Sequence, residues 1–294
     1  MGNNKKVPFG DLGAYLQNEL SEGTVKNYLY EIEKFKKHNK NPEKLSYQNL
    51  MEYVEYLRKS YTPQSVKRTI YAIKKYYDYL VETGKIKTNI AGNIRIKDGK
   101  ENPIQLQELL TEKELQKLLE PRKERYPILE KRNQIIMSLL VNQALLVGEI
   151  ERLKIENLDL KNAKIKVQKT GITNERILDL KAEQILLFYQ YLQEDRTKLQ
   201  RQKTSFFLLN KLGSAITKDD INYLVSTYQK GFTKKLTSVK IRQSVIKLKL
   251  DQGENLRKVQ CFAGHKHADT TEKYKETGIN ALQTAINQFH PLAF

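Results

Sequence analysis

The sequence has few of the residues that build disulfides, metal sites or membrane spans. Cys261 is the only cysteine among 294 residues, which excludes an internal disulfide and a paired-cysteine metal site. No apolar run approaches the roughly 18 residues of a membrane-spanning helix, since Ser138 interrupts the longest candidate, 135–141. The first residues, MGNNKKVPFGDLG, lack the apolar core of a signal peptide. These absences predict a cytoplasmic protein without a membrane partner.

Acidic residues are also in short supply. Lys+Arg number 52 against 34 Asp+Glu, which gives a net charge of +18 and a pI near 9.6. Such an excess favours a polyanionic partner, with nucleic acid ahead of an anionic membrane; a lysine-rich composition with solvated side chains is the alternative. The chain has no P-loop, no HExxH and no carboxylate cluster typical of a two-metal nuclease. We therefore predict no cofactor, no metal and no small-molecule substrate.

A chain of 294 residues is long enough for two domains with separate cores. Residues 1–95 show the apolar spacing of helices, with starts predicted after Ser21, Ser46 and Thr62 and a stop at Gly84. A polar stretch with glycine and proline follows, and predicts a linker over 96–106. The first part is therefore expected to be a helical domain.

Residues 107–294 are predicted to form a second, mainly helical domain. A long apolar helix is expected over 131–154. Alternating apolar residues on both sides of Gly171 then predict a small β-sheet over 161–180. Helices are expected again from Ala182 onward. The fold class is mainly α with a small β-sheet, and the second domain is α+β.

One stretch carries most of the functional information. IRQSVIKLKLDQGENLRKVQCFAGHKHADTTEKY sets Arg242, His265 and Tyr274 in one order, separated by 23 and then 9 residues. A glycine precedes the histidine, and Thr270 and Thr271 precede the tyrosine. This pattern resembles the C-terminal box of the tyrosine recombinases, the phage integrase and Xer-type family of DNA strand-exchange enzymes. The resemblance covers nearly the whole chain, more loosely outside this box.

The resemblance implies a helical SAM-like core-binding domain and an integrase-type catalytic domain acting on double-stranded DNA. It implies that Tyr274 forms a 3′-phosphotyrosine, that Arg242 and His265 hold the phosphate, and that Lys169 protonates the leaving 5′ oxygen. It further implies self-association on DNA as a dimer or tetramer, in the recombination or integration of a mobile element. In the family the segment matching 278–294 packs on a neighbouring subunit; folding back onto its own domain is the alternative.

Two positions depart from the family pattern. Leu146 stands where the family has its first arginine, and Val239 where it has the histidine of His-x-x-Arg. Gln243 also replaces a frequent histidine, and Arg152 is a possible substitute cation. Because charge-stabilising donors each contribute about 10²–10³ in rate, enzymatic activity is left open. The alternatives are a recombinase-derived protein that binds a DNA site without cutting it and, in third place, a topoisomerase-like relaxing enzyme.

Basic side chains in both domains are candidates for neutralising DNA phosphates. The third predicted helix of the first domain and the region before Arg242 supply them. The residues predicted to contact DNA are Lys67, Arg68, Lys74, Lys75, Lys235 and Lys240.

Overall fold

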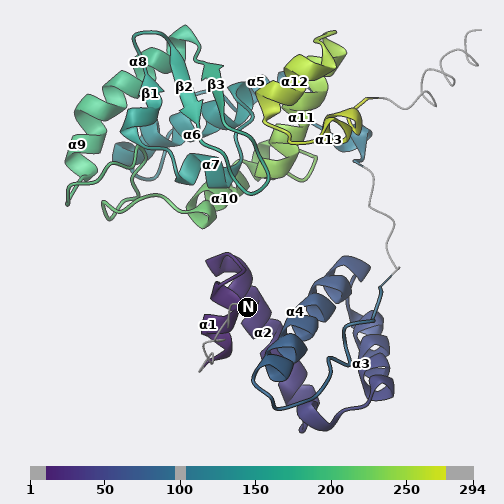
Figure 1. Cartoon of the computed structure of the whole chain (residues 1–294). Helices are drawn as coiled ribbons and strands as arrows, with labels where there is room; N and C mark the ends of the chain where they lie inside the picture. Colours follow the sequence, from purple (N-terminus) through teal and green to yellow (C-terminus); the bar gives the residue numbers. More distant parts are fainter. Residues whose placement is uncertain (1–10, 97–103, 276–294) are drawn as a thin grey trace, which may run out of the picture. The chain divides into compact units, whose positions relative to one another are not determined.

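The computed structural model describes residues 11–96 and 104–275 (Figure 1). The chain divides into two compact units, Met1–Asn102 and Pro103–Phe294, each of which has its own apolar core. The segment 278–294, for which a role in self-association is expected, lies outside the described residues, as does most of the predicted linker. Within the described ranges, no helix is both long and apolar enough to cross a bilayer.

The first unit is a bundle of helices, and the three predicted ones begin where expected. Ser46 caps the second of them by accepting a hydrogen bond from the Asn49 amide at 3.2 Å, and Thr62 caps the third. Gly84 follows the third with φ +74°. The elements are α1 (Leu12–Gln17), α2 (Glu22–His38), the 3-10 turn η1 (Pro42–Lys44), α3 (Tyr47–Ser60) and α4 (Pro63–Glu82).

Aromatic packing holds this bundle together, with α2 and α4 side by side (Figure 1). Phe35 of α2 is fully buried and meets the rings of Tyr53 and Tyr77 edge-on, with centroids 5.2 and 6.2 Å away. The Tyr77 hydroxyl donates to the carbonyl of Pro42 at 2.6 Å, so this buried polar group is satisfied.

The second unit is also mainly helical and contains a three-stranded antiparallel sheet. The strands, in spatial order, are β1 (Leu158–Asp159), β2 (Lys164–Val167) and β3 (Arg176–Asp179). The main helices are α5 (Glu112–Lys117), α6 (Glu130–Asn142), α7 (Val147–Glu151), α8 (Ala182–Gln190), α9 (Arg196–Leu199), α10 (Lys218–Thr227), α11 (Ser238–Asp251), α12 (Leu256–Ala263) and α13 (Ala268–Glu272). Short turns are η2 (Leu106–Glu108), η3 (Pro127–Leu129), η4 (Ile155–Asn157), the π-helical η5 (Tyr191–Asp195) and η6 (Gln229–Gly231).

The predicted small β-sheet is confirmed, and the register of the β2–β3 hairpin explains the alternation in the sequence. Ile165 pairs with Leu178, and both side chains face the core, whereas the neighbouring Lys166 and Ile177 face outward. The mainly helical fold with a small sheet is therefore as predicted.

The single helix expected over 131–154 is wrong. The chain leaves α6 after Asn142, and Ala144 adopts the left-handed conformation with φ +50°. Leu146 then begins α7 as its N-cap residue. The break is stabilised by a tertiary contact, because the Ala144 carbonyl accepts a hydrogen bond from the guanidinium of Arg242. Apolar periodicity cannot reveal such a contact between residues far apart in the chain.

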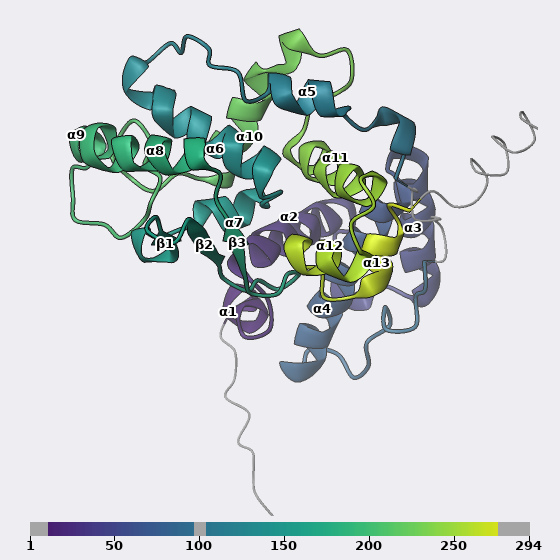
Figure 2. The same ribbon diagram turned by 90° about the horizontal axis from the view of Figure 1, so that it is seen from above.

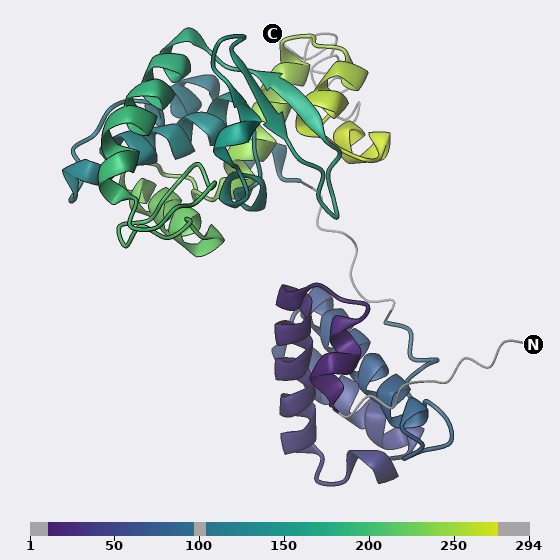
Figure 3. The ribbon, with the colours of Figure 1, turned by 60° about the vertical axis from the view of Figure 1, so that its left-hand side comes forward.

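The break and the hairpin bring distant segments together around α11. Helices α11, α12 and α13 lie next to one another (Figure 2). The loop that joins β2 and β3 extends beside α12 and α13 (Figure 3), where Thr173 forms a β-bridge with His265. The family-like box and the hairpin therefore meet at one place in the second unit.

Candidate active site

Arg242 lies on the buried face of α11, close to the Thr237 cap of that helix. Its side chain is 5% exposed. Nη1 donates to the carbonyl of Ala144, and Nη2 donates to the carbonyl of Ala263 at 2.5 Å. Burial lowers the pKa of the guanidinium to about 10, so it stays charged at neutral pH. Arg242 thus joins the α6–α7 turn to the end of α12, and it keeps further N–H groups for another acceptor.

His265 directly follows the end of α12. Gly264 ends the helix with φ +71°, and a Cβ at this position would lie 2.6 Å from Nη1 of Arg176, so glycine is required. The His265 side chain is largely buried, and its Nδ1 lies 2.8 Å from Oγ1 of Thr271. Burial, reinforced by the charges of Arg242 and Arg176, lowers the pKa of the ring to about 4. The imidazole is therefore neutral at pH 7.

This buried neutral ring makes the stability of the protein depend on pH. The folded pKa of about 4 lies below the unperturbed 6.5, so between these values the unfolded chain binds a proton that the folded chain does not. The free energy of unfolding should consequently fall as pH drops from 7 to 4, by about 3 kcal/mol from this group. Denaturant unfolding of wild type and His265→Gln at both pH values measures the difference.

His267→Gln is the matched control, because His267 is exposed. The free energy of unfolding of His267→Gln should depend on pH as that of the wild type does. Between pH 7 and pH 4, the free energy of unfolding of His265→Gln should fall by about 3 kcal/mol less than that of the wild type. Equal losses in all three proteins would show that His265 is not held neutral by the fold.

Tyr274 packs against the histidine. Its ring is nearly parallel to that of His265, at 11° with centroids 6.4 Å apart, and is 6% exposed. Burial raises the pKa of the phenol, while the charge of Arg242 and a hydrogen bond with the Gln243 side chain oppose the rise. Its apolar neighbours are Ile246, Val259 and Ala263. The structure therefore brings Arg242, His265 and Tyr274 into one cluster, with a protonated phenol at neutral pH.

A buried ion pair completes this cluster. Arg176 of β3 donates from Nη1 and Nη2 to the two carboxylate oxygens of Glu149 at 2.7 and 2.9 Å. The hydroxyl of Thr173 donates to the same carboxylate at 2.8 Å. Together these contacts lower the pKa of Glu149 against the opposing effect of burial. Two guanidiniums therefore face one carboxylate and a neutral imidazole, which leaves a net positive charge that favours an anion.

The sequence-based predictions do not include a role for Arg176. The signal was available in the strand pattern, because Arg176 shares the inward register of Leu178 and Leu180. A charged residue at an inward strand position requires a buried partner.

Lys169 lies on the hairpin, where it is exposed. It lines a small hollow together with Arg152 and Glu149. Arg152 is the C-cap residue of α7, and its Nε donates to the carbonyl of Gly148 at 2.9 Å. Lys169 and the possible substitute cation Arg152 therefore lie next to Glu149, at the edge of the cluster.

Two hydrogen bonds tie the hairpin tip to the segment around His265. The Asn174 amide donates to the Gly264 carbonyl, and Lys266 Nζ donates to the Gly171 carbonyl, both at 2.8 Å. The position of the Lys169 hairpin is therefore coupled to the position of the histidine.

The two departures from the family pattern lie near the surface. Val239, in the first turn of α11, is 58% exposed. Leu146 is half-buried at the start of α7, where its amide donates to the Glu149 carboxylate at 2.9 Å. A larger polar side chain at Val239 would therefore meet solvent rather than a packed core.

Two of the four cations predicted on α4 are half-buried and line one hollow. Lys67 and Lys74 are seven residues apart, and line a hollow of about 290 Å³ with the exposed Tyr71 and with Arg95. Lys74 also donates to the carbonyl of Gly92 at 3.0 Å. Three cations and an exposed aromatic ring therefore gather on this face of the first unit.

The other two are held by carboxylates. Arg68 pairs with the buried Glu31 at 2.9 Å, and Lys75 pairs with Glu19. Their charges are partly compensated within the bundle. They are therefore less available to phosphates than Lys67 and Lys74.

The cations predicted near α11 differ in the same way. Lys235 is exposed and has no ion-pair partner within the described ranges. Lys240 pairs with Glu108 at 3.2 Å, and its side chain is 14% exposed. Lys235 is therefore the freer of the two.

Comparison with known proteins identifies the class. The phage integrase family matches residues 108–278, and the phage integrase N-terminal SAM-like domain matches residues 13–84. The chain therefore belongs to the phage integrase family, the tyrosine recombinases.

Individual relatives match along almost the whole chain. Tyrosine recombinase XerD of Listeria innocua is 29% identical, over 95% of this chain and 96% of that protein. Tyrosine recombinase XerC of Thermodesulfovibrio yellowstonii is 27% identical, over 95% and 93%. The crystal structure of the XerH recombinase bound to difH shares the fold, with a TM-score of 0.68 at 20% identity over 93% of each chain.

Proposed function

We propose that the protein binds a site in duplex DNA and exchanges strands there through Tyr274. The Tyr274 oxygen attacks the scissile phosphorus and loses its proton to water, the bond from phosphorus to the 5′ oxygen breaks, and a 3′-phosphotyrosine remains. Lys169 gives the leaving 5′ oxygen its proton, while Arg242 and His265 hold the phosphate. The observation that carries this proposal is the convergence of Arg242, His265 and Tyr274 around a net positive charge.

A duplex with a nick next to the scissile position tests this proposal. The short 5′-hydroxyl strand diffuses away after attack, which traps the covalent adduct for denaturing electrophoresis. The expected result is a slowly accumulating adduct. Complete absence of adduct on a site that the protein binds specifically would contradict the proposal.

Binding without cleavage is the second candidate function. It is favoured by Leu146 and Val239, which cannot stabilise charge on a phosphate. The engagement of Arg242 by two main-chain carbonyls also favours it, because those hydrogen bonds leave fewer of its N–H groups for a phosphate. In this case the protein occupies a recombination site and controls access to it.

Both candidates require DNA binding that depends strongly on salt. We propose that Lys67, Lys74 and Lys235 contact backbone phosphates, and that the paired Arg68, Lys75 and Lys240 add weaker attraction. With a net charge of +18, the log–log slope of affinity against salt should be about −5, roughly a thousandfold loss between 50 and 200 mM. Fluorescence anisotropy of a labelled duplex measures it.

Charge-matched variants separate these contacts from net charge. Lys67→Gln with Lys74→Gln should make the slope shallower by about 2. The control, Lys26→Gln with Lys37→Gln, removes two lysines that pair with glutamates on α2, and should change the slope little. Equal effects of the two pairs would assign the binding to overall charge instead of the α4 face.

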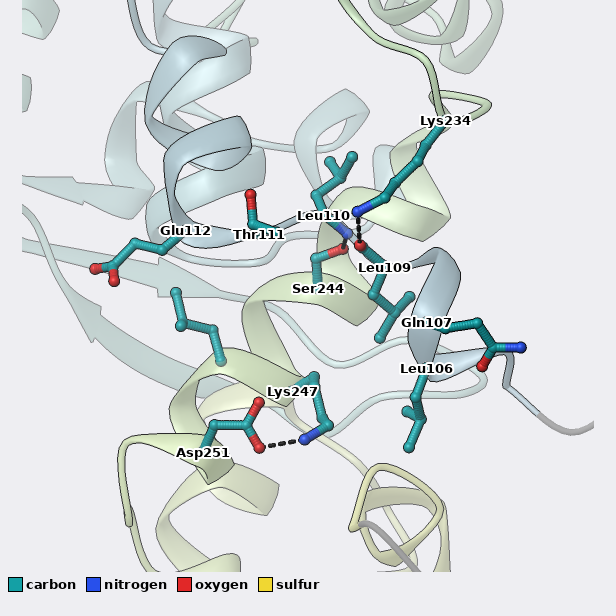
Figure 4. A pocket seen from close by; sticks show the side chains of 11 residues that line it. Leu106, Gln107, Leu109, Leu110, Thr111, Glu112, Lys234, Ser244, Lys247 and Asp251 are labelled. Atoms are coloured by element: carbon teal, nitrogen blue, oxygen red, sulfur yellow. Dashed lines mark hydrogen bonds and ion pairs between the residues drawn. The ribbon is translucent and has the colours of Figure 1, made fainter. Parts of the chain in front are cut away.

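We also propose that copies of the protein associate on DNA. A hollow of about 600 Å³ lies between the η2–α5 region and α11 (Figure 4). Its lining combines apolar groups with charged ones: Leu106, Leu109, Leu110, Leu248, Lys234, Lys247, Glu112 and Asp251. This mixture suits an amphipathic segment, and the sequence of 278–294 from a neighbouring copy has that pattern. Mass photometry of the DNA complex counts the copies.

This function places the protein in the cytoplasm, where its DNA substrate would lie. The two units would then act as a core-binding clamp (1–95) and a catalytic domain (107–294), joined by residues 96–106.

A further inference from the structure

The hydroxyl of Thr271 has one visible hydrogen-bond partner, and that partner is His265. Thr271 Oγ1 lies 2.8 Å from Nδ1 of the ring. Thr271 is fully buried, so water cannot replace this contact. No other hydrogen bond to this hydroxyl is present within the described residues. The direction of this one bond therefore determines whether the buried hydroxyl proton has an acceptor.

The opposite ring nitrogen of His265 faces a different environment. Among the described residues, Arg176 Nε is the one side-chain nitrogen or oxygen that is both buried and without a partner. His265 Nε2 has no hydrogen-bond partner among the described residues either, and it is not one of their buried unpartnered atoms, so it retains access to solvent. The ring is consequently oriented with Nδ1 inward on Thr271 and Nε2 outward.

A neutral imidazole carries one proton, on either Nδ1 or Nε2. If Nδ1 carries it, Nδ1–H donates to the Thr271 oxygen, and the Thr271 hydroxyl proton then has no acceptor among the described residues. If Nε2 carries it, the hydroxyl donates to Nδ1, and both groups of this contact are satisfied. A buried donor without an acceptor is disfavoured. Satisfying both groups therefore selects the second arrangement.

We propose that Thr271 is a positioning residue, which donates its hydroxyl proton to Nδ1 and thereby keeps the proton of neutral His265 on the outward-facing Nε2. The arginines on either side support this arrangement, because Arg242 and Arg176 oppose a second proton on the ring. The consequence for cleavage rests on the function proposed above: Nε2–H is the donor that His265 offers to the scissile phosphate. The other tautomer would present a lone pair to the phosphate and repel it.

The tautomer can be observed directly by nitrogen NMR at pH 7. The chain has four histidines, and comparison with His265→Gln assigns the resonances of interest. The expected wild-type result is a protonated Nε2 and an unprotonated Nδ1. A protonated Nδ1 in the wild type would overturn the proposal, and this measurement requires no variant of Thr271 to fold.

Three substitutions separate the hydroxyl from the volume of the side chain. Thr271→Ser keeps the hydroxyl and should keep the wild-type tautomer. Thr271→Val keeps the shape without the hydroxyl, and should show a mixture or the Nδ1-protonated form. Thr270→Val is the matched control, because its side chain is exposed in the same helix. An unchanged His265 spectrum in folded Thr271→Val would overturn the proposal.

Cleavage supplies a second readout. On the nicked duplex, Thr271→Val should slow adduct formation by about 10- to 100-fold. This effect should not exceed the rate loss caused by removing the imidazole donor itself. Thr271→Ser should restore the rate, and DNA affinity should be unchanged in both. Failure of the wild type to form any adduct would refute the proposed cleavage, whereas the NMR result would still decide the tautomer. A Thr271→Val protein with the altered tautomer and the wild-type rate would refute the catalytic consequence.

Discussion

Replacing Leu146 with arginine and Val239 with histidine is expected to raise the rate of DNA cleavage by about 10² or more. Each substitution adds a donor to a phosphate on which charge develops, and one such donor typically contributes about 10²–10³ in rate. The combined gain should be smaller than the product of the two single gains, because groups that act on one phosphate do not contribute independently.

The structure makes this double substitution feasible. Val239 is 58% exposed, so a histidine there need not enter a packed core. Leu146 is half-buried at the N-terminus of α7. Its backbone amide donates a hydrogen bond to the Glu149 carboxylate, and this bond does not involve the Leu146 side chain. A new arginine at this position can reach solvent. It would, however, add a third positive charge near Arg176 and Arg242, and this repulsion would lower the stability of the fold. A thermal melt should therefore accompany the cleavage assay.

Two controls test whether an increase in cleavage comes from the added phosphate donors and from attack by Tyr274. Leu212→Arg with Leu186→His adds the same side chains at exposed positions elsewhere in the second unit, and should leave cleavage unchanged. The double variant combined with Tyr274→Phe should form no adduct. A stable double variant that remains inert would favour the protein that binds without cutting. Fast cleavage by the wild type would instead direct attention to Arg152 as the substitute cation.

Tyr274→Phe is expected to abolish the covalent adduct while DNA affinity changes by no more than about a factor of a few, since only the attacking oxygen is lost. The stability cost should be near 1 kcal/mol, because the lost hydroxyl gives up one hydrogen bond with a half-buried partner, Gln243. Denaturing electrophoresis on the nicked duplex measures the adduct, and anisotropy measures the affinity.

Tyr228→Phe is the matched control for this substitution. Tyr228 is also partly buried in the second unit, where its ring stacks under Arg122 at 3.7 Å. It should form adduct at the wild-type rate. Adduct that survives in Tyr274→Phe would mean that another side chain attacks the phosphate.

Local signals in the sequence were sufficient for much of the architecture. The starts of α3 and α4 follow from the caps Ser46 and Thr62, and the hairpin follows from alternation around Gly171. Such features depend on residues within a few positions of each other, so their physical cause lies in the local sequence. The helix expected over 131–154 failed for the opposite reason, because Arg242 stabilises the break at Ala144 from about a hundred residues away.

The candidate site shows the same division. The order and spacing of Arg242, His265 and Tyr274 indicate the family, and the missing donors at Leu146 and Val239 are visible in the sequence alone. Spacing, however, specifies neither what a side chain contacts nor how deeply it is buried.

By itself, then, the sequence determined the family, the two-part helical architecture and the residue types available for phosphate chemistry. Only the tertiary structure decided that Arg242 is engaged by two carbonyls, that Arg176 and Glu149 form a buried pair, and that Thr271 contacts the His265 ring. The physical reason is that charge state and hydrogen-bond direction depend on burial and on partners brought together by packing, and the chain encodes these only through its complete fold.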